Sequence, residues 1–282
     1  MGRHRRGGPP SPAPAQGQAQ AQTGTWPQAG TNVRRLRAGV AFTDLTVDFK
    51  NFRLGPLSLR FGASSLTCLV GPNGSGKTTL IRALMGMVKL SAGEVLYDAM
   101  PMSSRPPGVL RLVGFVPDGP DNLVPELTAR ELWELHALAH SRVSGSFREM
   151  MAHAEHLSRI LDLPPSRATI RGYSHGMQKK TQLIAGLMHQ PDYLILDEPR
   201  NGLDPIAGEK LDRLVTAECR RGATVILATH DLRYAARVAD SVVVLTRGQC
   251  TAAGSPDQLR MTGEHDFVDT FFRLVRESGH DG

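Results

Sequence analysis

The sequence predicts an α/β fold with a mainly parallel sheet, an antiparallel β flank and an inserted helical subdomain. Short β-like segments come first, at Val40–Phe49, Leu57–Phe61 and Ser65–Val70. Strands then alternate with helices, apart from a helix-rich stretch at 128–163. Strands first and alternation afterwards are typical of an antiparallel flank beside a parallel sheet that helices cover.

The helix-rich stretch begins with Thr128 and Glu131, which have the spacing of a capping box, where each residue satisfies the other's free backbone group. Three leucines then share one helical face: Leu132, Leu135 and Leu138. We expect a helical subdomain at about 119–178, inserted into a domain that spans 38–282.

After this stretch the chain returns to alternating strands and helices. Tyr193–Leu196 and Thr224–Thr229 are apolar and predict buried strands, with Pro205–Arg221 as the helix that joins them. Asp204 suits the N-cap of this helix, with a proline in the first turn. Ser255–Gln258 repeats that start signal near the C-terminus.

Residues 1–37 differ from the rest of the chain in composition. They are rich in Pro, Gly, Ala and Gln and have too few large apolar side chains to offset the entropy of ordering, so we expect a disordered tail. The tail has no acid, and its arginines account for the whole net charge of +6. They are Arg3, Arg5, Arg6, Arg34, Arg35 and Arg37. The folded part is therefore formally neutral, which argues against nucleic-acid binding; the tail is interpreted as a solubilising extension or as a weak contact to anionic lipid.

Apolar runs and cysteines limit where the protein resides. The longest apolar runs, such as Leu183–Met188, fall far below the roughly 20 residues of a membrane span, and the N-terminus lacks a secretory signal. Cys68, Cys219 and Cys250 lack the spacing of metal ligands. We expect a cytosolic protein that does not cross a bilayer by itself.

Residues 71–78 fit the pattern G-x-x-x-x-G-K-[ST], between an apolar segment and a helical one. In this context backbone N–H groups and a helix N-terminus bind phosphate. Lys77 would reach the β- and γ-phosphates, and the Thr78 hydroxyl would ligate Mg²⁺. The sequence therefore predicts a P-loop NTPase. The expected nucleotide-binding residues are Gly71, Pro72, Asn73, Gly74, Ser75, Gly76, Lys77, Thr78 and Thr79.

Two acids, Asp197 and Glu198, end the predicted strand that starts at Tyr193. The carboxyl ends of parallel strands face the ligand crevice, so these acids should lie beside the phosphates. Asp197 would hold Mg²⁺, directly or through water, and Glu198 would polarise the attacking water.

Three further segments resemble motifs of the ABC ATPase family, in the family's order. They are Tyr173–Met177 for the signature, Gly202–Asp204 for the D-loop and His230 for the switch histidine. The resemblance runs from about Val40 to Leu259 and implies ATP as the nucleotide, with a helical subdomain that carries the signature.

The resemblance also implies roles for single residues. Two subunits of such an ATPase pack head to tail around two ATP molecules, which predicts a second copy of this chain as partner. Ser174 and Gly176 would contact the γ-phosphate across that interface, and His230 would sense it. Phe49 stands where the family stacks a ring on adenine, with Phe52 as the alternative.

Pro125–Glu131 and the signature resemble drug- and lipid-type exporters, in which the ATPase lies at the cytoplasmic face of the membrane beside a separate permease.

The sequence departs from the family at three positions. Asp118 replaces the glutamine of the Q-loop and is interpreted as a ligand of Mg²⁺; His175 replaces a glycine, and Arg200 a small residue. Alternative functions are a soluble ABC ATPase for translation or cofactor assembly and a scaffold without turnover.

Overall fold

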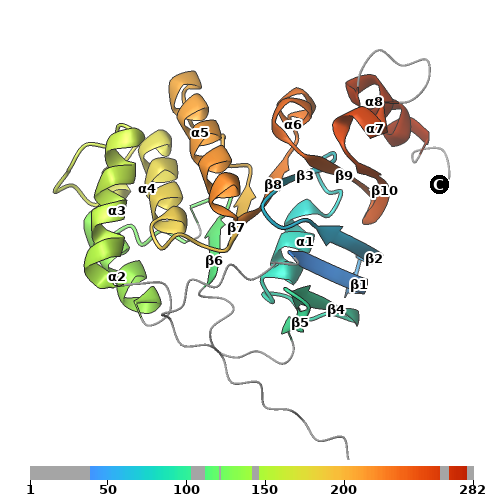
Figure 1. Cartoon of the computed structure of the whole chain (residues 1–282), viewed down its shortest axis with the longest axis horizontal. Helices are drawn as coiled ribbons and strands as arrows, with labels where there is room; N and C mark the ends of the chain where they lie inside the picture. The colour runs from blue at the N-terminus through green and yellow to red at the C-terminus, as the bar shows by residue number, and fades with distance from the viewer. Residues whose placement is uncertain (1–38, 103–111, 121, 142–145, 261–266, 278–282) are drawn as a thin grey trace, which may run out of the picture. The chain divides into compact units, whose positions relative to one another are not determined.

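The structure, a computed structural model, describes residues 39–102, 112–120, 122–141, 146–260 and 267–277 (Figure 1). The chain divides into two units, Met1–Thr31 and Asn32–Gly282. The first unit and the predicted tail at 1–37 lie outside the described residues, so the fold below is that of the second unit.

A six-stranded sheet forms the centre of this unit. Its strands are β3 (Leu66–Val70), β6 (Val113–Val116), β7 (Tyr193–Asp197), β8 (Thr224–Thr229), β9 (Ser241–Thr246) and β10 (Gln249–Gly254), in the order β10-β9-β3-β8-β7-β6. All neighbours pair in parallel except β9 with β10. Every residue of β3, β7 and β8 is buried, as expected for strands that helices cover on both faces. The predicted parallel sheet is confirmed.

A second sheet supplies the antiparallel flank. Its strands are β1 (Val40–Phe49), β2 (Phe52–Phe61), β4 (Ala92–Tyr97) and β5 (Met100–Pro101), in the order β2-β1-β4-β5. All its pairs are antiparallel. The third β-like segment of the sequence does not belong here, because it forms β3 of the central sheet.

The helices fill the layers around the central sheet. They are α1 (Lys77–Leu84), α2 (Ala129–His140), α3 (Phe147–Ile160), α4 (His175–Leu187), α5 (Pro205–Arg221), α6 (Leu232–Val238), α7 (Pro256–Leu259) and α8 (Phe267–Glu277), with a 3-10 turn at Ile170–Gly172. Alternate residues of β7 point to opposite layers. Ile195 shares a core with Leu80 of α1 and Phe42 of β1, whereas Leu194 packs with Leu183 of α4. The helix α1 therefore lies between the two sheets.

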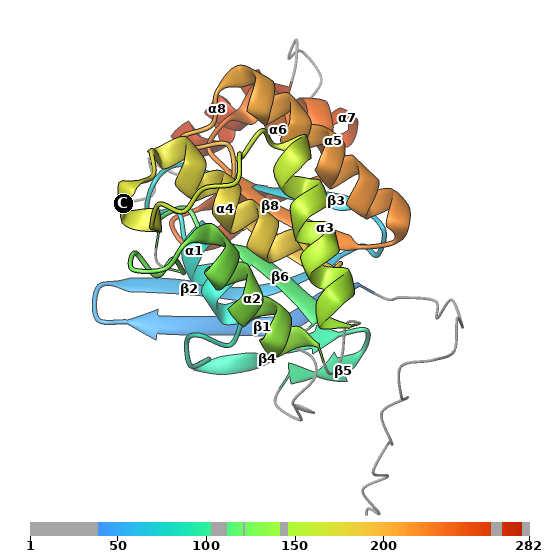
Figure 2. The ribbon, with the colours of Figure 1, turned by 90° about the vertical axis from the view of Figure 1, so that its left-hand side faces the viewer.

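Helices α2 and α3 lie side by side with α4 (Figure 2). The capping box of Thr128 and Glu131 is present at the start of α2, as predicted. Trp133 of α2 donates its indole N–H to the carbonyl of Thr181 on α4, at 3.2 Å. The expected leucine face was wrong in part: Leu132 is buried, but Leu135 and Leu138 are exposed, because Ala129, Trp133 and Ala137 form the rest of the core-facing side. Within the described ranges, no helix is long and apolar enough to span a membrane.

Three histidines lie together at the junction of α2 and α4: His189 is buried, and His136 and His140 are half-buried. His189 is only 3% exposed, and its ring stacks on His140 at 4.0 Å between centroids. Burial lowers the pKa of His189 to about 3, and the neighbouring His140 adds to this. Burial likewise lowers the pKa of His136 to about 4.

These shifts predict acid instability. The unfolded chain binds more protons than the folded chain from about pH 6.5 down to the lowered pKa values, so stability is present above this window and lost as the pH falls through it. At pH 5.5, His189 alone should cost about 1.4 kcal/mol relative to pH 7.5. Urea unfolding at both pH values should show that His189→Phe loses less stability than the parent. The exposed His156→Gln should behave as the parent, and equal losses in all three proteins would contradict the assignment.

Candidate functional site

The loop between β3 and α1 is shaped by its glycines. Gly74 and Gly76 have φ values of 79° and 108°, which side chains other than glycine rarely adopt. At Gly71, a Cβ atom would lie 2.2 Å from the carbonyl oxygen of Leu245 on β9. The backbone can therefore curl at the carboxyl end of β3 and start α1 at Lys77.

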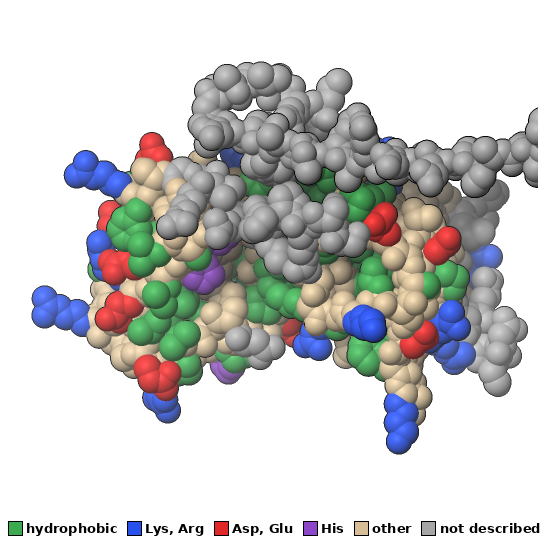
Figure 3. Space-filling view, turned by 90° about the horizontal axis from the view of Figure 1, so that it is seen from below, with side chains coloured by type: hydrophobic (Ala, Val, Ile, Leu, Met, Phe, Trp, Pro, Cys, Tyr) green, Lys and Arg blue, Asp and Glu red, His purple; other side chains and the backbone are tan. Residues whose placement is uncertain are grey.

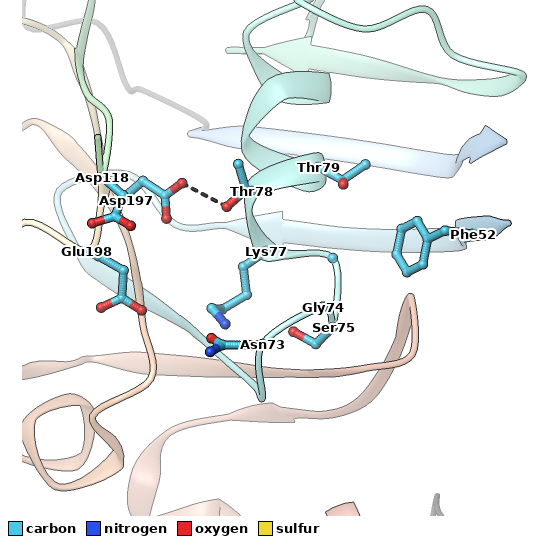
Figure 4. Close-up of a pocket in the computed structure, with 11 residues that line it drawn as sticks. Phe52, Asn73, Gly74, Ser75, Lys77, Thr78, Thr79, Asp118, Asp197 and Glu198 are labelled. Carbon is cyan, nitrogen blue, oxygen red and sulfur yellow. Dashed lines mark hydrogen bonds between the residues drawn. The ribbon is translucent and has the colours of Figure 1, made fainter. Parts of the chain in front are cut away.

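This loop borders a cavity of about 430 Å³. The lining residues are Phe52, Asn73, Gly74, Ser75, Gly76, Lys77, Thr78, Thr79, Asp118, Asp197 and Glu198 (Figure 4). The loop and α1 contribute one side, and the acids come from the ends of β6 and β7. Three separate segments, the loop with α1, the end of β6 and the end of β7, thus meet at one cavity. They contain most of the site residues that the sequence predicted.

Lys77 is buried at the base of the loop. Its Nζ donates to the carbonyls of Gly71 at 2.8 Å and Pro72 at 3.3 Å. Burial lowers the pKa of Lys77, and the charges of Glu198 and Asp197 oppose this shift. The buried hydroxyl of Ser75 has no partner among the described residues. Because a buried polar atom rarely stays unpaired, a cationic Lys77 and a free Ser75 fit an anionic ligand such as a phosphate chain.

Asp197 faces the start of α1. Its Oδ2 accepts a hydrogen bond of 2.9 Å from the hydroxyl of Thr78 (Figure 4). Burial raises the pKa of Asp197. Across the part of the chain that the structure describes, no three His, Cys, Asp or Glu side chains are grouped to hold a metal ion. A Mg²⁺ ion here would therefore need Thr78, Asp197 and oxygen atoms of the nucleotide.

Glu198 follows Asp197 in a left-handed backbone conformation, with a φ of 44°. Its carboxylate lies between the last residue of β8 and the residue that follows the strand. Oε2 accepts from the Thr229 hydroxyl at 3.2 Å, and Oε1 lies 2.9 Å from Nδ1 of His230. The Glu198 side chain is 13% exposed, whereas that of His230 is 63% exposed and does not line the cavity.

Asp118 follows β6 and reaches the cavity. Its Oδ1 accepts a hydrogen bond of 2.8 Å from the side-chain amide of Asn201. The carbonyls of Pro117 and Asp118 accept from the buried Nζ of Lys179 on α4, at 2.8 and 2.7 Å. Asn201 and Lys179 could not be predicted as site residues, since both contacts join segments far apart in the chain.

Ser174 and Gly176 lie apart from this cavity. The Ser174 hydroxyl caps α4 by accepting from the backbone N–H of Met177 at 3.3 Å. A Cβ atom at Gly176 would lie 2.9 Å from the carbonyl oxygen of Gly202, so the signature segment packs against the predicted D-loop.

The two candidate aromatic rings occupy different places. Phe52 lines the cavity, whereas Phe49 is 51% exposed and is not a lining residue. Their ring centroids lie 6.5 Å apart. The geometry favours Phe52, the alternative, over Phe49 for stacking on a base.

Comparisons with known proteins agree with this site. Residues 54–201 match the family described as "ABC transporter". The chain is 31% identical over 239 residues to the Nod factor export ATP-binding protein I of Rhizobium etli, covering 84% of this chain and 72% of that protein. It is 32% identical over 250 residues to the daunorubicin resistance ATP-binding protein DrrA3 of Streptomyces coeruleorubidus, covering 86% and 77%.

Solved structures are similar to the fold as well. The structure titled as the ATP binding subunit of an ABC transporter matches with a TM-score of 0.78 and 26% identity, over 84% of this chain and 100% of that one. A bacterial ABC transporter cassette solved as a dimer matches with a TM-score of 0.69 and 24% identity, over 77% and 98%. With its phosphate loop, paired acids and matching relatives, the chain belongs to the ABC transporter family as an ATP-binding, ATP-hydrolysing subunit.

Proposed function

We propose that this ATPase powers export through a separate permease, at the cytoplasmic face of the cell membrane. The observation that carries the proposal is the similarity, along most of the chain, to two proteins named for export and for drug resistance. The exporter-like segment Pro125–Glu131 supports it: its last residues begin α2, which packs against α4, and there Arg130 and Glu131 are exposed.

Transport and membrane contact can be tested together. A tagged chain would be isolated from detergent-solubilised membranes of its source cells, and its ATPase rate would be compared with that of the chain alone. We expect a polytopic membrane protein to co-purify and to change the ATPase rate. After reconstitution into vesicles, the complex should move a hydrophobic dye toward the side opposite the ATPase, only with ATP. A chain found only in the soluble fraction, with full activity alone, would favour a soluble ABC ATPase.

We infer that the working form contains two copies of this chain. Ser174 and Gly176 do not line the chain's own cavity, so their predicted contact to ATP needs a second subunit. The dimeric cassette of similar fold supports this arrangement.

The residues of the cavity would divide the hydrolysis between them. Lys77, Ser75 and the loop N–H groups would hold the phosphates, and Thr78 and Asp197 would hold Mg²⁺, which neutralises developing charge on the phosphate oxygens. The water oxygen bonds to the γ-phosphorus as the bond to the bridging oxygen breaks, and Glu198 accepts the water's proton. ADP and phosphate leave. His230, 2.9 Å from Glu198, would contact the γ-phosphate.

We propose that Asp118 acts on the metal side of this site. A carboxylate at this position attracts Mg²⁺ but also adds to the negative field of the nearby Asp197, whose pKa it helps to raise. Because Asn201 already occupies one carboxylate oxygen, the other is left for the metal or for its water.

Asp118→Ala should therefore raise the Mg²⁺ concentration for half-maximal ATPase activity, by about tenfold if Asp118 acts as an outer ligand. Asp118→Gln should restore much of the function, since its amide oxygen can still face the metal. Titration of Mg²⁺ at saturating ATP measures both variants. If both match the parent in metal dependence, Asp118 has no role at the metal.

We also propose that the chain does not bind nucleic acid. On the face drawn in Figure 3, basic and acidic side chains are interspersed among hydrophobic ones and form no basic stripe. Nucleic-acid binding relies on clustered basic charge. The mixed charges on this face and the formal neutrality of the folded part both support the proposal.

A further inference from the structure

Arg200 lies in the segment after Glu198 and connects this segment to helices α5 and α6. The segment makes a tight turn, in which the backbone N–H of Asn201 donates to the carbonyl of Glu198 at 3.1 Å. From this turn, Nη1 of Arg200 donates to both carboxylate oxygens of Asp212 on α5, at 2.9 and 3.0 Å. Its guanidinium carbon lies 4.6 Å from the ring centre of Tyr234 on α6. A guanidinium can donate and stack at once, so one side chain joins three segments.

Asp212 is the centre of this junction. Besides Arg200, it accepts from the Tyr234 hydroxyl at 2.9 Å and from Nη2 of Arg237 at 3.0 Å. Its side chain is 15% exposed, so these charge-assisted bonds are partly shielded from water. Tyr234 and Arg237 both belong to α6, so Arg200 and α6 are held by the same carboxylate.

The position of α6 matters because of what precedes it. Asp231 caps this helix by accepting from the backbone N–H of Tyr234 at 2.9 Å, and His230 comes directly before it. Arg200 thus links the turn that carries Glu198 to the helix that carries His230. These two residues face each other at 2.9 Å.

Gly208 of α5 leaves the space that the guanidinium of Arg200 occupies. A Cβ atom at Gly208, in the second turn of α5, would lie 2.6 Å from Nη2 and 3.0 Å from Cζ of Arg200. Any larger residue there would push the guanidinium away from Asp212. Glycine inside a helix is unfavourable, so its presence fits a requirement for this close approach.

The backbone of Glu198 needs such support. Its φ of 44° is uncommon for a residue with a side chain, and a strained conformation persists only where its surroundings hold it. The N–H of Glu198 is fixed on β8 through the carbonyl of Ala228, at 2.9 Å. Arg200 fixes the other end of the turn.

We propose that Arg200 is a positioning residue. Through Asp212 and Tyr234, it holds the Glu198 carboxylate within hydrogen-bond distance of His230. This rests on the proposed role of Glu198 as the base. Arg200 does not line the cavity, so it acts on turnover and leaves ATP binding intact.

The test is a cycle of Arg200→Thr, Gly208→Ala and the double variant, with Arg213→Thr as a matched exposed arginine on α5. Arg200→Thr and Gly208→Ala should each lower kcat about tenfold, as expected when a reacting group is misplaced, with KM for ATP within about twofold. The double variant should be no slower than Arg200→Thr. Arg200→Lys should recover part of kcat, since it can bond Asp212 but cannot stack flat on Tyr234.

Thermal unfolding separates this role from a stabilising one. In Gly208→Ala the gain in helix propensity opposes the loss of the Arg200–Asp212 bonds, so its Tm should stay close to that of the parent while turnover falls. Unchanged kcat in Arg200→Thr, or the same loss from Gly208→Ala with and without Arg200, would overturn the proposal. Normal turnover in Glu198→Gln would instead refute the role of Glu198 itself, and this outcome is read independently of the cycle.

Discussion

Glu198→Gln is expected to bind ATP and Mg²⁺ as the parent does and to lose at least about a hundredfold in turnover. Glutamine has nearly the same shape and can keep contacts to Thr229 and His230, but an amide cannot accept the proton of the attacking water. Phosphate release under saturating ATP measures the loss, and binding of a fluorescent ATP analogue measures the retained affinity.

The same variant should accumulate as a dimer with ATP, because closed sites that do not hydrolyse do not open. Light scattering with and without ATP reports this. The matched control is Glu209→Gln, an exposed glutamate on α5, which should hydrolyse ATP as the parent does. Parental turnover in Glu198→Gln would remove Glu198 as the base, and a monomer with ATP would count against a two-subunit site.

Lys77→Ala should lose about a hundredfold in ATP affinity, since a buried charge-assisted contact to phosphate is worth about 3 kcal/mol. No neighbour can replace this cation. Lys179, a second buried lysine near the site, is held by the carbonyls of Pro117 and Asp118. Turnover should fall with binding.

Binding by calorimetry and phosphate release measure the effect of Lys77→Ala. The exposed Lys89→Ala, just beyond α1, is the control and should match the parent. Undiminished hydrolysis by Lys77→Ala would show that the phosphates bind elsewhere.

The sequence predicted the parts of the fold that depend on local pattern. The glycine loop between β3 and α1, the strand that ends in Asp197 and the caps at Thr128, Asp204 and Ser255 all form as expected, because each uses residues near one another in the chain. The parallel sheet followed from their alternation.

Contacts that join distant segments were not predictable in this way. Leu135 and Leu138 fit a helical stripe, yet which side of α2 meets α4 is decided by Trp133 and its bond to Thr181. The ring nearest the cavity, Phe52, depends on how the β1–β2 hairpin is placed over the loop. Arg200 was visible only as an unusual residue, because its partner Asp212 has no local signal.

The glycines of the phosphate loop differ in what maintains them. Around Gly74 a Cβ atom would meet nothing within 4 Å, so only its backbone angle restricts it, and asparagine is a tolerable substitute. Gly71 is restricted by the backbone of Leu245, which belongs to the sheet and not to any ligand. In a descendant that had lost nucleotide binding, Lys77 would be free to drift, whereas Gly71 would persist for as long as the fold did. The presence of Gly71 therefore indicates only that the fold is kept, whereas the presence of Lys77 indicates that nucleotide binding is kept.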